Sequence, residues 1–514
     1  MAALPANRPF DAALKIVQNL RQAGHEAYFA GGCVRDLLLG HEPSDYDVAT
    51  SATPDIVLAM FDRTFAVGAH FGVVLVATTC AGAATCGGAD AARATDQECV
   101  PSNYIVTEVA TFRSDGAYSD GRHPDAVRYT TSAEEDVKRR DFTVNGLLLD
   151  PMLIGPMLLD LTPVQPMKGT SFSSYNPDPK TTGALAPEGN TLPTSHPLHI
   201  SILDFVGGLS DLEEGIIRAI GNPANRFEED HLRMLRAVRF AARFDFDLEA
   251  QTQSAIRNLA KKIQAVSRER VRDELTRMLT EGHARRAFEL LDETGLLAEV
   301  LPEIPRMKGV DQPPQYHPEG DVWVHTLGLL AQLEPGCSPA LAWGALLHDV
   351  GKPPTFRRAP DRIRFDGHVE VGVAMAAEIL RRLRFSNEDT RQILQLIENH
   401  MRFADAQRMK ASTLKRFFRL DGFDQHLALH RMDCLAGSGN LDHWHFVRER
   451  WLAMPEEAVR PKPLITGREL IAAGYVPGPA FKHMLKTIED AQLEGTISTA
   501  EDAMQLLHNR FPAG

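Results

Sequence analysis

Apolar and polar positions along the chain follow two different periods, and the change from one to the other divides the sequence. After an amphipathic helix predicted at 11–23, short apolar runs alternate with polar residues in the way of half-buried strands. We expect strands at 26–30, 46–49, 73–78, 105–112 and 147–150. From about residue 213 onward, apolar residues recur at i, i+3, i+4 and i+7 almost throughout. The pattern predicts an α/β head followed by a long helical body.

The helical body divides into amphipathic segments. The predicted helices are 228–243, 251–263, 268–281, 283–293, 325–333, 340–349, 370–383, 387–400 and 411–418. Two segments show neither period: 79–103 is rich in Ala, Gly, Thr and Cys, and about 154–199 is rich in Pro, Ser, Thr, Gly and Asn. The runs LLLDP and LDFVGGLSDL on either side of the second segment resemble neighbouring parts of one sheet edge. We therefore expect both segments to be flexible insertions.

Length and composition limit the class of protein. A chain of 514 residues is too long for one hydrophobic core, so several domains are expected. No apolar run approaches the roughly 18 residues that a membrane-spanning helix needs, and the first residues lack the pattern of a signal peptide. The six cysteines are scattered, which is typical of free thiols. These features predict a cytoplasmic protein with no membrane partner.

The charge is acidic overall but uneven. A net charge of -13 argues against sequence-independent binding of DNA, because phosphate binding depends on clustered Lys and Arg. Basic residues nevertheless crowd the middle of the chain, from Arg226 to Arg277. A local basic surface can bind a polyanion, so an RNA partner is still compatible with the composition.

A glycine pair near the N-terminus has the setting of a triphosphate site. The run FAGGCVRDLLLG passes from a predicted strand through Gly31 and Gly32 into a helix. Glycines remove side chains where the backbone must approach a triphosphate, and the helix N-terminus offers free N–H groups. Arg35, on that helix, can add a fork of donors.

Paired carboxylates follow in the run SDYDVAT. If 45–49 is a strand, Asp45 and Asp47 point to the same face and can together ligate a pair of divalent ions. Two ions roughly 3.5–4 Å apart would activate a hydroxyl and neutralise a leaving pyrophosphate. Glu108, in a later predicted strand, is the candidate third carboxylate.

Either feature alone is usually a turn or a solvated loop, but further runs follow in order: RRDFTVNG, GGLSDL, EDHLRMLRAVRFAARF and RERVRDEL. Together they resemble the bacterial tRNA nucleotidyltransferase and poly(A) polymerase branch of the polymerase-beta-like superfamily, over the chain except its two insertions and its first residues. The resemblance implies an α+β fold with a nucleotidyltransferase head, an all-α neck and body, an HD domain and a C-terminal arm.

The resemblance also implies domain limits. We expect a nucleotidyltransferase head at 1–150, the end of the head at 151–212, and a helical neck and body at 213–310 that binds the base and the RNA. The HD domain is expected at 311–450 and the helical arm at 451–514.

Roles for residues follow from the same resemblance. Asp45 and Asp47 would bind catalytic Mg²⁺, while Gly32 and Arg35 would help to hold the triphosphate of the incoming nucleotide. Arg140 and Asp141 would lie at the nucleotide sugar, where a 2′-hydroxyl distinguishes RNA precursors.

The run at 229–244 is expected to read the base. Asp230 and Arg233 are three residues apart, hence on one face of the predicted helix, and they present acceptor and donor groups to a base edge. In the resembled family such a pair recognises cytosine and adenine. Arg236 and Arg239 would neighbour the phosphates or support the pocket. Without the resemblance, the segment is more simply an amphipathic helix with a basic solvated face.

Two features favour CCA addition within the branch. The run FAVGAHFGVVLVAT resembles the matching strand of CCA-adding enzymes, and TFRSDGAYSDGRHPDAV resembles the flexible loop that terminal A addition requires, here at 114–126. The expected function is template-independent addition of CCA to tRNA from CTP and ATP. The alternatives are a poly(A) polymerase or A-adding enzyme and, in another class, a non-catalytic RNA-binding or regulatory HD protein. The intact Asp45 and Asp47 pair disfavours the last.

Histidines and aspartates in the second half have the order of an HD metal site: His325, His348, Asp349, His368, His400 and Asp433. A single His on an apolar helix is usually a core residue. Imidazoles with carboxylates suit nickel, manganese or iron better than magnesium. The site therefore predicts phosphomonoesterase or 2′,3′-cyclic phosphodiesterase activity, with a retained but idle HD fold as the alternative. Nothing in the sequence decides the oligomeric state.

Overall fold

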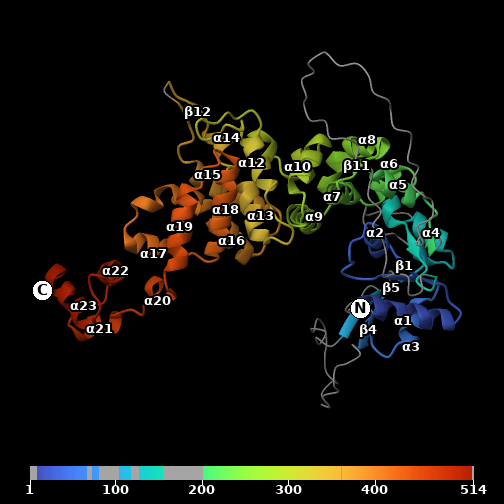
Figure 1. Ribbon diagram of the computed structural model, residues 1–514, viewed down its shortest axis with the longest axis horizontal. Helices are drawn as coiled ribbons and strands as arrows, with labels where there is room; N and C mark the ends of the chain where they lie inside the picture. The colour runs from blue at the N-terminus through green and yellow to red at the C-terminus, as the bar shows by residue number, and fades with distance from the viewer. Residues whose placement is uncertain are drawn as a thin grey trace, which may run out of the picture. The chain divides into compact units, whose positions relative to one another are not determined.

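The computed structural model describes residues 8–65, 72–79, 104–116, 127–153, 201–360 and 362–511. These form two compact units, Met1–Val266 and Ser267–Gly514 (Figure 1). The first unit holds a sheet and a few helices, and the second is almost wholly helical. This confirms the expected α+β fold. The predicted insertions lie almost entirely outside the described residues, as does most of the predicted loop at 114–126.

A seven-stranded sheet forms the base of the first unit, in the order β3-β4-β5-β2-β1-β8-β9. Its strands are β1 (Ala27–Ala30), β2 (Val48–Thr50), β3 (Thr64–Phe65), β4 (Val73–Thr79), β5 (Tyr104–Thr111), β8 (Leu148–Leu149) and β9 (Ile202–Leu203). Neighbours are antiparallel except β2 and β5, which are parallel. The pairing of β8 with β9 confirms that the sequences flanking the second insertion are neighbours at one sheet edge. A hairpin of β6 (Arg113–Asp115) and β7 (Val127–Tyr129) follows β5.

The two faces of the sheet are covered differently, as the alternation of side chains requires. Helices α1 (Arg8–Gln22) and α3 (Pro54–Met60) pack against central strands. Phe29 of β1 lies on the α1 side, where its ring contacts Phe10 and Tyr46. On the other face, alanines and Phe112 pack with α4 (Ala133–Lys138) in a separate apolar cluster. The RRDFTVNG run follows α4 directly, so it lies on this second face.

Four helices follow the sheet in the first unit: α5 (Gly208–Glu214), α6 (Pro223–Glu229), α7 (Arg233–Phe244) and α8 (Ala250–Leu259). A short parallel pair, β10 (Ile216–Ile217) and β11 (Asp247–Leu248), joins them. Gly208 explains part of the GGLSDL run, because a Cβ there would lie 2.3 Å from the carbonyl oxygen of Thr143. Only glycine lets α5 approach the RRDFTVNG segment this closely.

The prediction of a single helix at 228–243 is wrong: the chain forms two helices there, α6 and α7, with a break at 230–232. Asp230 is extended, with φ −148° and ψ 107°, and its Oδ1 accepts a hydrogen bond from the amide of Leu232. A short acidic side chain competes in this way with the helical hydrogen bonds. Asp230 therefore stands before α7 and not on it.

The second unit consists of helices and one small hairpin. Its longer helices are α9 (Arg268–Thr280), α10 (Ala284–Glu293), α12 (Val322–Leu330), α13 (Pro339–Leu347), α15 (His368–Arg382), α16 (Asn387–Asn399), α17 (Ala411–Phe418), α18 (Phe423–Ala436), α19 (Asp442–Ala453), α22 (Pro479–Glu494) and α23 (Ala500–Arg510). The last two, with α21 (Gly467–Ala472), enclose an apolar cluster of their own around Leu470 and Leu507. Among the described helices, none has the length and apolar character to cross a membrane.

We predict that Phe29→Ala lowers the free energy of unfolding of the first unit by about 3–5 kcal/mol, because it leaves a cavity under α1. Phe29 is fully buried, whereas Phe65, at the end of β3, is 46% exposed. Phe65→Ala is the control and should change stability by less than about 0.5 kcal/mol. Urea denaturation followed by circular dichroism measures both. Equal effects of the two substitutions would contradict this packing.

Candidate nucleotide site and metal centre

Asp45 and Asp47 lie on the face of the sheet that carries α4. Strand β2 begins at Val48, later than predicted, but the carbonyl of Asp47 still accepts a hydrogen bond of 3.0 Å from the amide of Ala30 in β1. Between the two aspartates, the ring of Tyr46 is buried on the α1 face. The carboxylates on either side of it therefore project to the opposite face, as the alternation predicts.

Glu108 is brought beside them by the parallel pairing of β2 with β5. Val48 lies opposite Val109, so Glu108 is next to Asp47. Burial, then the carboxylates of Glu108 and Asp45, raises the pKa of Asp47 to about 7. Burial and Asp45 also raise the pKa of Glu108. Asp47 is half-buried, whereas Asp45 and Glu108 are exposed. Neighbouring carboxylates of this kind fit the requirements of a divalent cation site.

The glycine pair stands against Arg140. Gly31 has a positive φ of 72°, and a Cβ there would lie 3.0 Å from Nη1 of Arg140. Arg140 in turn donates a hydrogen bond of 3.0 Å to Asp136 and lowers the pKa of Asp47. Gly32 begins helix α2 (Gly32–Leu38). Gly31, Gly32 and Arg140 therefore share one surface with the carboxylates, as a site for a metal-bound triphosphate needs.

Arg35 is buried more deeply than the sequence suggests. It is 4% exposed and bonds to Asp36 at 2.6 Å and to the side-chain oxygen of Asn145 at 2.5 Å. Its guanidinium also lies over the ring of Phe244 in α7, 4.4 Å from the ring centre. Arg35 thus joins α2 to α7, and its contact with a triphosphate stays a prediction.

Asp141 joins the same two parts of the unit. Its carboxylate accepts hydrogen bonds from Nε of Arg236, at 2.9 Å, and from the side-chain amide of Asn145, at 3.0 Å. Burial opposes its charge, but Arg236 and Asn145 hold the pKa of Asp141 down to about 2. The chain Arg35–Asn145–Asp141–Arg236 fixes the RRDFTVNG segment between α2 and α7.

The predicted base readers lie at the start of α7. Nη1 of Arg233 donates to Glu229 Oε2 at 2.5 Å and to the carbonyl of Arg226 at 3.0 Å. Arg239 is buried, with its guanidinium 4.3 Å from the ring centre of Phe240. Asp230 and Arg233 are not on one helix. Whether both side chains can face the same base therefore depends on the turn between them.

Asn145, Glu229 and Arg226 are neighbours of these residues that the sequence reasoning missed. Each bonds to a predicted site residue, but none carries a metal-ligand or base-edge pattern of its own. The available signal was their position: Asn145 lies within the RRDFTVNG run, Glu229 begins the EDHLRMLRAVRFAARF run, and Arg226 lies just before it.

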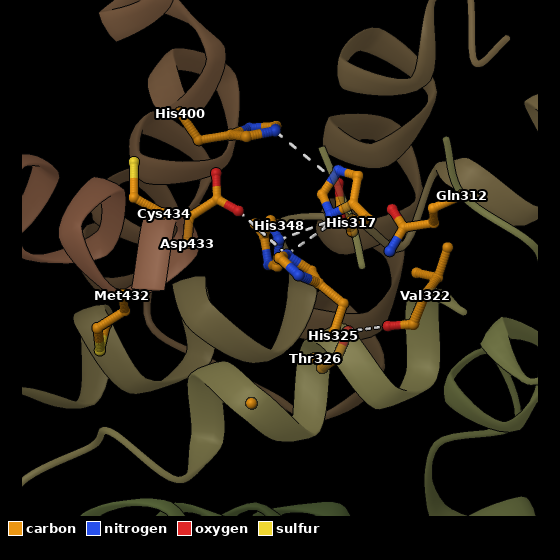
Figure 2. A network of polar contacts seen from close by, with 12 residues as sticks. Gln312, His317, Val322, His325, Thr326, His348, His400, Met432, Asp433 and Cys434 are labelled. Carbon is orange, nitrogen blue, oxygen red and sulfur yellow. Dashed lines mark hydrogen bonds and ion pairs between the residues drawn. The ribbon is translucent and has the colours of Figure 1, made fainter. Parts of the chain in front are cut away.

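A second centre lies in the other unit, where the structure brings all six predicted HD residues together. They occur in two groups of ligand atoms, each within 4.8 Å: His325, His348 and Asp433 form one, and Asp349, His368 and His400 form the other. Figure 2 shows several of these side chains pointing toward one another from α12, α18 and the end of α13. Imidazole and carboxylate ligands in such a group are typical of transition-metal sites.

Asp349 is a member of the second group and also lies close to the histidines of the first. Its Oδ2 lies 3.1 Å from Nε2 of His348 and 3.9 Å from Nε2 of His325. Its Oδ1 lies 3.9 Å from Nε2 of both His368 and His400. Asp349, with one carboxylate oxygen toward each group, would help to hold a metal ion at this centre.

Hydrogen bonds orient the imidazoles toward the centre. Nδ1 of His348, His368 and His400 each lies within 3.0 Å of a backbone carbonyl, which can only accept. Their Nδ1 therefore carries the proton, and the lone pair of Nε2 points inward. Burial is the main cause that lowers the pKa of His400 to about 4 and keeps its imidazole neutral.

Several inward atoms have no hydrogen-bond partner in the described part of the chain. They are Nε2 of His348, His368 and His400, and both carboxylate oxygens of Asp349. Asp349 is an ion-pair partner instead: its Oδ2 lies 2.7 Å from Nζ of Lys352. Buried polar atoms without partners are costly unless a ligand satisfies them, so this donor set fits a metal.

Glu319, His317 and Lys352 adjoin the centre and were missed from the sequence. Oε1 of Glu319 lies 2.6 Å from Nδ1 of His325 and 2.9 Å from Nδ1 of His317. Burial opposes the charge of His325, but hydrogen bonds to Asp433 and Glu319 raise its pKa to about 9. A carboxylate behind a ligating histidine is usual in metal sites, and the HPEGD spacing before His325 was the available signal.

Family profiles match three consecutive parts of the chain. The poly A polymerase head domain matches residues 27–162, and the probable RNA and SrmB-binding site of polymerase A matches residues 245–307. The HD domain matches residues 322–430. The head profile covers the carboxylate site, and the HD profile covers all predicted HD ligands except Asp433.

Curated relatives and solved structures agree with these profiles. A CCA-adding enzyme of Lactobacillus helveticus is 28% identical over 96% of both chains, and that of Geobacillus thermodenitrificans is 36% identical over 56% of this chain and 54% of its own. The structure of the Bacillus stearothermophilus CCA-adding enzyme in complex with CTP matches with TM-score 0.64 and 26% identity over 98% of both chains. A Thermotoga maritima enzyme solved with tRNA shares the fold, with TM-score 0.53 at 16% identity.

We predict that the second unit binds a transition metal at Asp349 and its neighbours. Adding Mn²⁺ or Ni²⁺ should raise the melting temperature by several degrees, because the ligand binds the folded state alone. Asp349→Asn should abolish both the shift and the metal content measured by mass spectrometry. The control is Asp366→Asn, which removes only an exposed ion pair with Arg357. Retained metal in the Asp349 variant would contradict this site.

Proposed function

We propose that this protein adds CCA to the 3′ end of tRNA from CTP and ATP. The chain belongs to the family of bacterial CCA-adding tRNA nucleotidyltransferases with a C-terminal HD domain. The observation that carries this proposal is the match over 98% of both chains to a CCA-adding enzyme whose structure contains CTP. The carboxylate cluster and the arginine network in the head support it, because both occur where nucleotidyl transfer needs them. The cytoplasm, where tRNA is completed, is the expected location.

The head residues divide the work of the reaction. Asp45 and Asp47 would hold Mg²⁺, with Glu108 as the neighbouring carboxylate; the bound ions supply activation of the attacking hydroxyl and neutralise the leaving pyrophosphate. Gly31, Gly32 and Arg140 adjoin this cluster and would take the triphosphate. Arg35 would act on it through helix α2.

Base selection is assigned to the start of α7. Arg233 presents donors to a base edge and Asp230 an acceptor, so protein replaces a nucleic acid template. Asp141 would lie at the ribose, and Arg236 holds Asp141 in place. Arg239, buried against Phe240, would support the pocket from behind.

We propose that the domain limits given above follow this division; the boundary between the two compact units, at Val266 and Ser267, falls inside the third of these domains. The head at 1–150 and its end at 151–212 carry the chemistry, and the helical part at 213–310 carries the base readers and RNA contacts. The HD domain at 311–450 and the arm at 451–514 complete the chain. Oligomeric state plays no part in the proposal.

We further propose a hydrolase function for the HD centre. The favouring observation is Asp349, with oriented imidazoles on both sides and unpartnered ligand atoms. Nickel or manganese would supply activation of water for attack on a phosphate ester. Lys352, paired with Asp349 and Gln312, places a fixed positive charge beside the centre that suits an anionic substrate. Phosphomonoesters and 2′,3′-cyclic phosphates at RNA ends are the proposed substrates.

We predict that tRNA lacking its 3′ end gains two residues with CTP alone and one more when ATP is added. Asp45→Asn and Asp47→Asn should abolish this extension and leave tRNA affinity nearly unchanged, because they remove metal-ligand charge only. Extension is measured on denaturing gels, and affinity by filter binding. Long A tails with ATP alone would indicate a poly(A) polymerase, and variants with near wild-type extension would exclude these carboxylates.

We predict that the two centres fail independently. Replacing His348 and Asp349 by Ala should abolish hydrolysis of 2′,3′-cyclic AMP and phosphomonoesters, assayed with Ni²⁺ or Mn²⁺, and should spare CCA addition. Asp47→Asn should do the reverse. If the wild-type protein hydrolyses neither substrate with any of these metals, the HD residues are structural and this second function fails.

A further inference from the structure

We propose that Arg226 is a positioning residue for nucleotide selection, which holds the base reader Arg233 in register with the segment that binds the sugar and triphosphate. The proposal rests on the proposed function, since it concerns the accuracy of the same reaction. Arg226 carries no base-edge or metal-ligand role in the site described above. It lies on α6, outside the elements that carry the carboxylates.

One side of Arg226 is tied to Arg233. Nη1 of Arg226 donates a hydrogen bond of 2.9 Å to Glu229 Oε2, the same oxygen that accepts from Arg233 at 2.5 Å. Arg233 also donates to the backbone carbonyl of Arg226 at 3.0 Å. The base reader is therefore linked to Arg226 through a shared carboxylate and through the main chain.

The other side of Arg226 is tied to the end of α4. Nη2 donates to the carbonyl of Lys138 at 2.7 Å, and Nη1 donates to the carbonyl of Arg139 at 3.2 Å. Nε donates to the carbonyl of Ile220 at 3.2 Å. Lys138 and Arg139 directly precede Arg140 and Asp141, so the position of their carbonyls sets where the proposed sugar and triphosphate residues lie.

The chemistry of arginine suits this bridge. A guanidinium offers several donors in one rigid plane, so it can fix acceptors from α4, α6 and the loop between them at once. A lysine at this position would offer one flexible point charge and could not hold all three in a fixed arrangement.

The ion pair between Arg226 and Glu229 is not enclosed by packed side chains on every side. A cavity of about 270 Å³ is lined by Arg226, Glu229, Arg139 and the hairpin residues from Ser114 to Gly116, among others. Without the ion pair, Glu229 has room to turn, and Arg233 loses its carboxylate partner. The side chain of Arg233 would then sample several rotamers. The difference in affinity between the correct and the incorrect base would therefore become smaller.

The test is the discrimination between CTP and UTP at the first added position, on tRNA lacking its 3′ end. In Arg226→Gln, the ratio of kcat/KM for CTP over UTP should fall about tenfold, mainly through a higher KM for CTP, because ground-state and transition-state contacts with the base are lost together. Arg226→Lys should lose less. Dependence on Mg²⁺ should not change, because the carboxylate cluster is untouched.

Lys262→Ala is the matched control, because Lys262 pairs with Glu228 on the same helix α6 at an exposed position. It should leave the ratio unchanged. Glu229→Gln breaks the same link from the other partner, and should lower the ratio even if Arg226→Gln does not fold. An unchanged CTP to UTP ratio in the folded variants, or an equal loss in the control, overturns the proposal. Wild-type protein that adds only A overturns the proposed function instead, and the ratio of ATP to CTP then tests Arg226.

Discussion

The buried carboxylate of Asp141 is the constraint on which the nucleotide site depends. A largely buried charge must be paired where it lies, and Asp141 is paired with Arg236 of α7 and bonded to Asn145. Asn145 is in turn bound by Arg35 of α2. Elements far apart in the sequence are thereby held at fixed distances, so the proposed triphosphate site on the sheet and the proposed base reader on α7 could act on one nucleotide.

The two centres of the chain use the same principle with different ligands. In the head, burial and neighbouring carboxylates raise the pKa of Asp47 and of Glu108, and such a group of carboxylates suits a hard divalent ion. In the HD centre, imidazoles fixed through their Nδ1 protons call for a softer one. Each centre is complete within its own unit, which is why the two activities are expected to be separable.

The sequence predicted the elements better than the contacts between them. Period and motif order were sufficient for five strands of the seven-stranded sheet and for most of the helices predicted between 251 and 418. They also identified the six HD residues that the structure brings together. They were not sufficient for the break at Asp230, where one side chain replaces a helical hydrogen bond. The burial of Arg35 also went unpredicted, because it depends on Asn145, which only the fold brings beside it. Glu319 lies six residues before His325, but nothing in the local pattern says that its carboxylate turns back to that imidazole. The roles of the head residues stay predictions from resemblance.

Diffraction from crystals grown with Mn²⁺ and CTP tests the central claim, that protein side chains both hold the ions and read the base. We expect anomalous manganese peaks within coordination distance of Asp45 and Asp47 in the head. We also expect the cytosine edge against Arg233, with no nucleic acid template opposite it. Manganese away from both aspartates, or a cytosine that faces solvent while Arg233 keeps its bonds to Glu229 and Arg226, would contradict this claim.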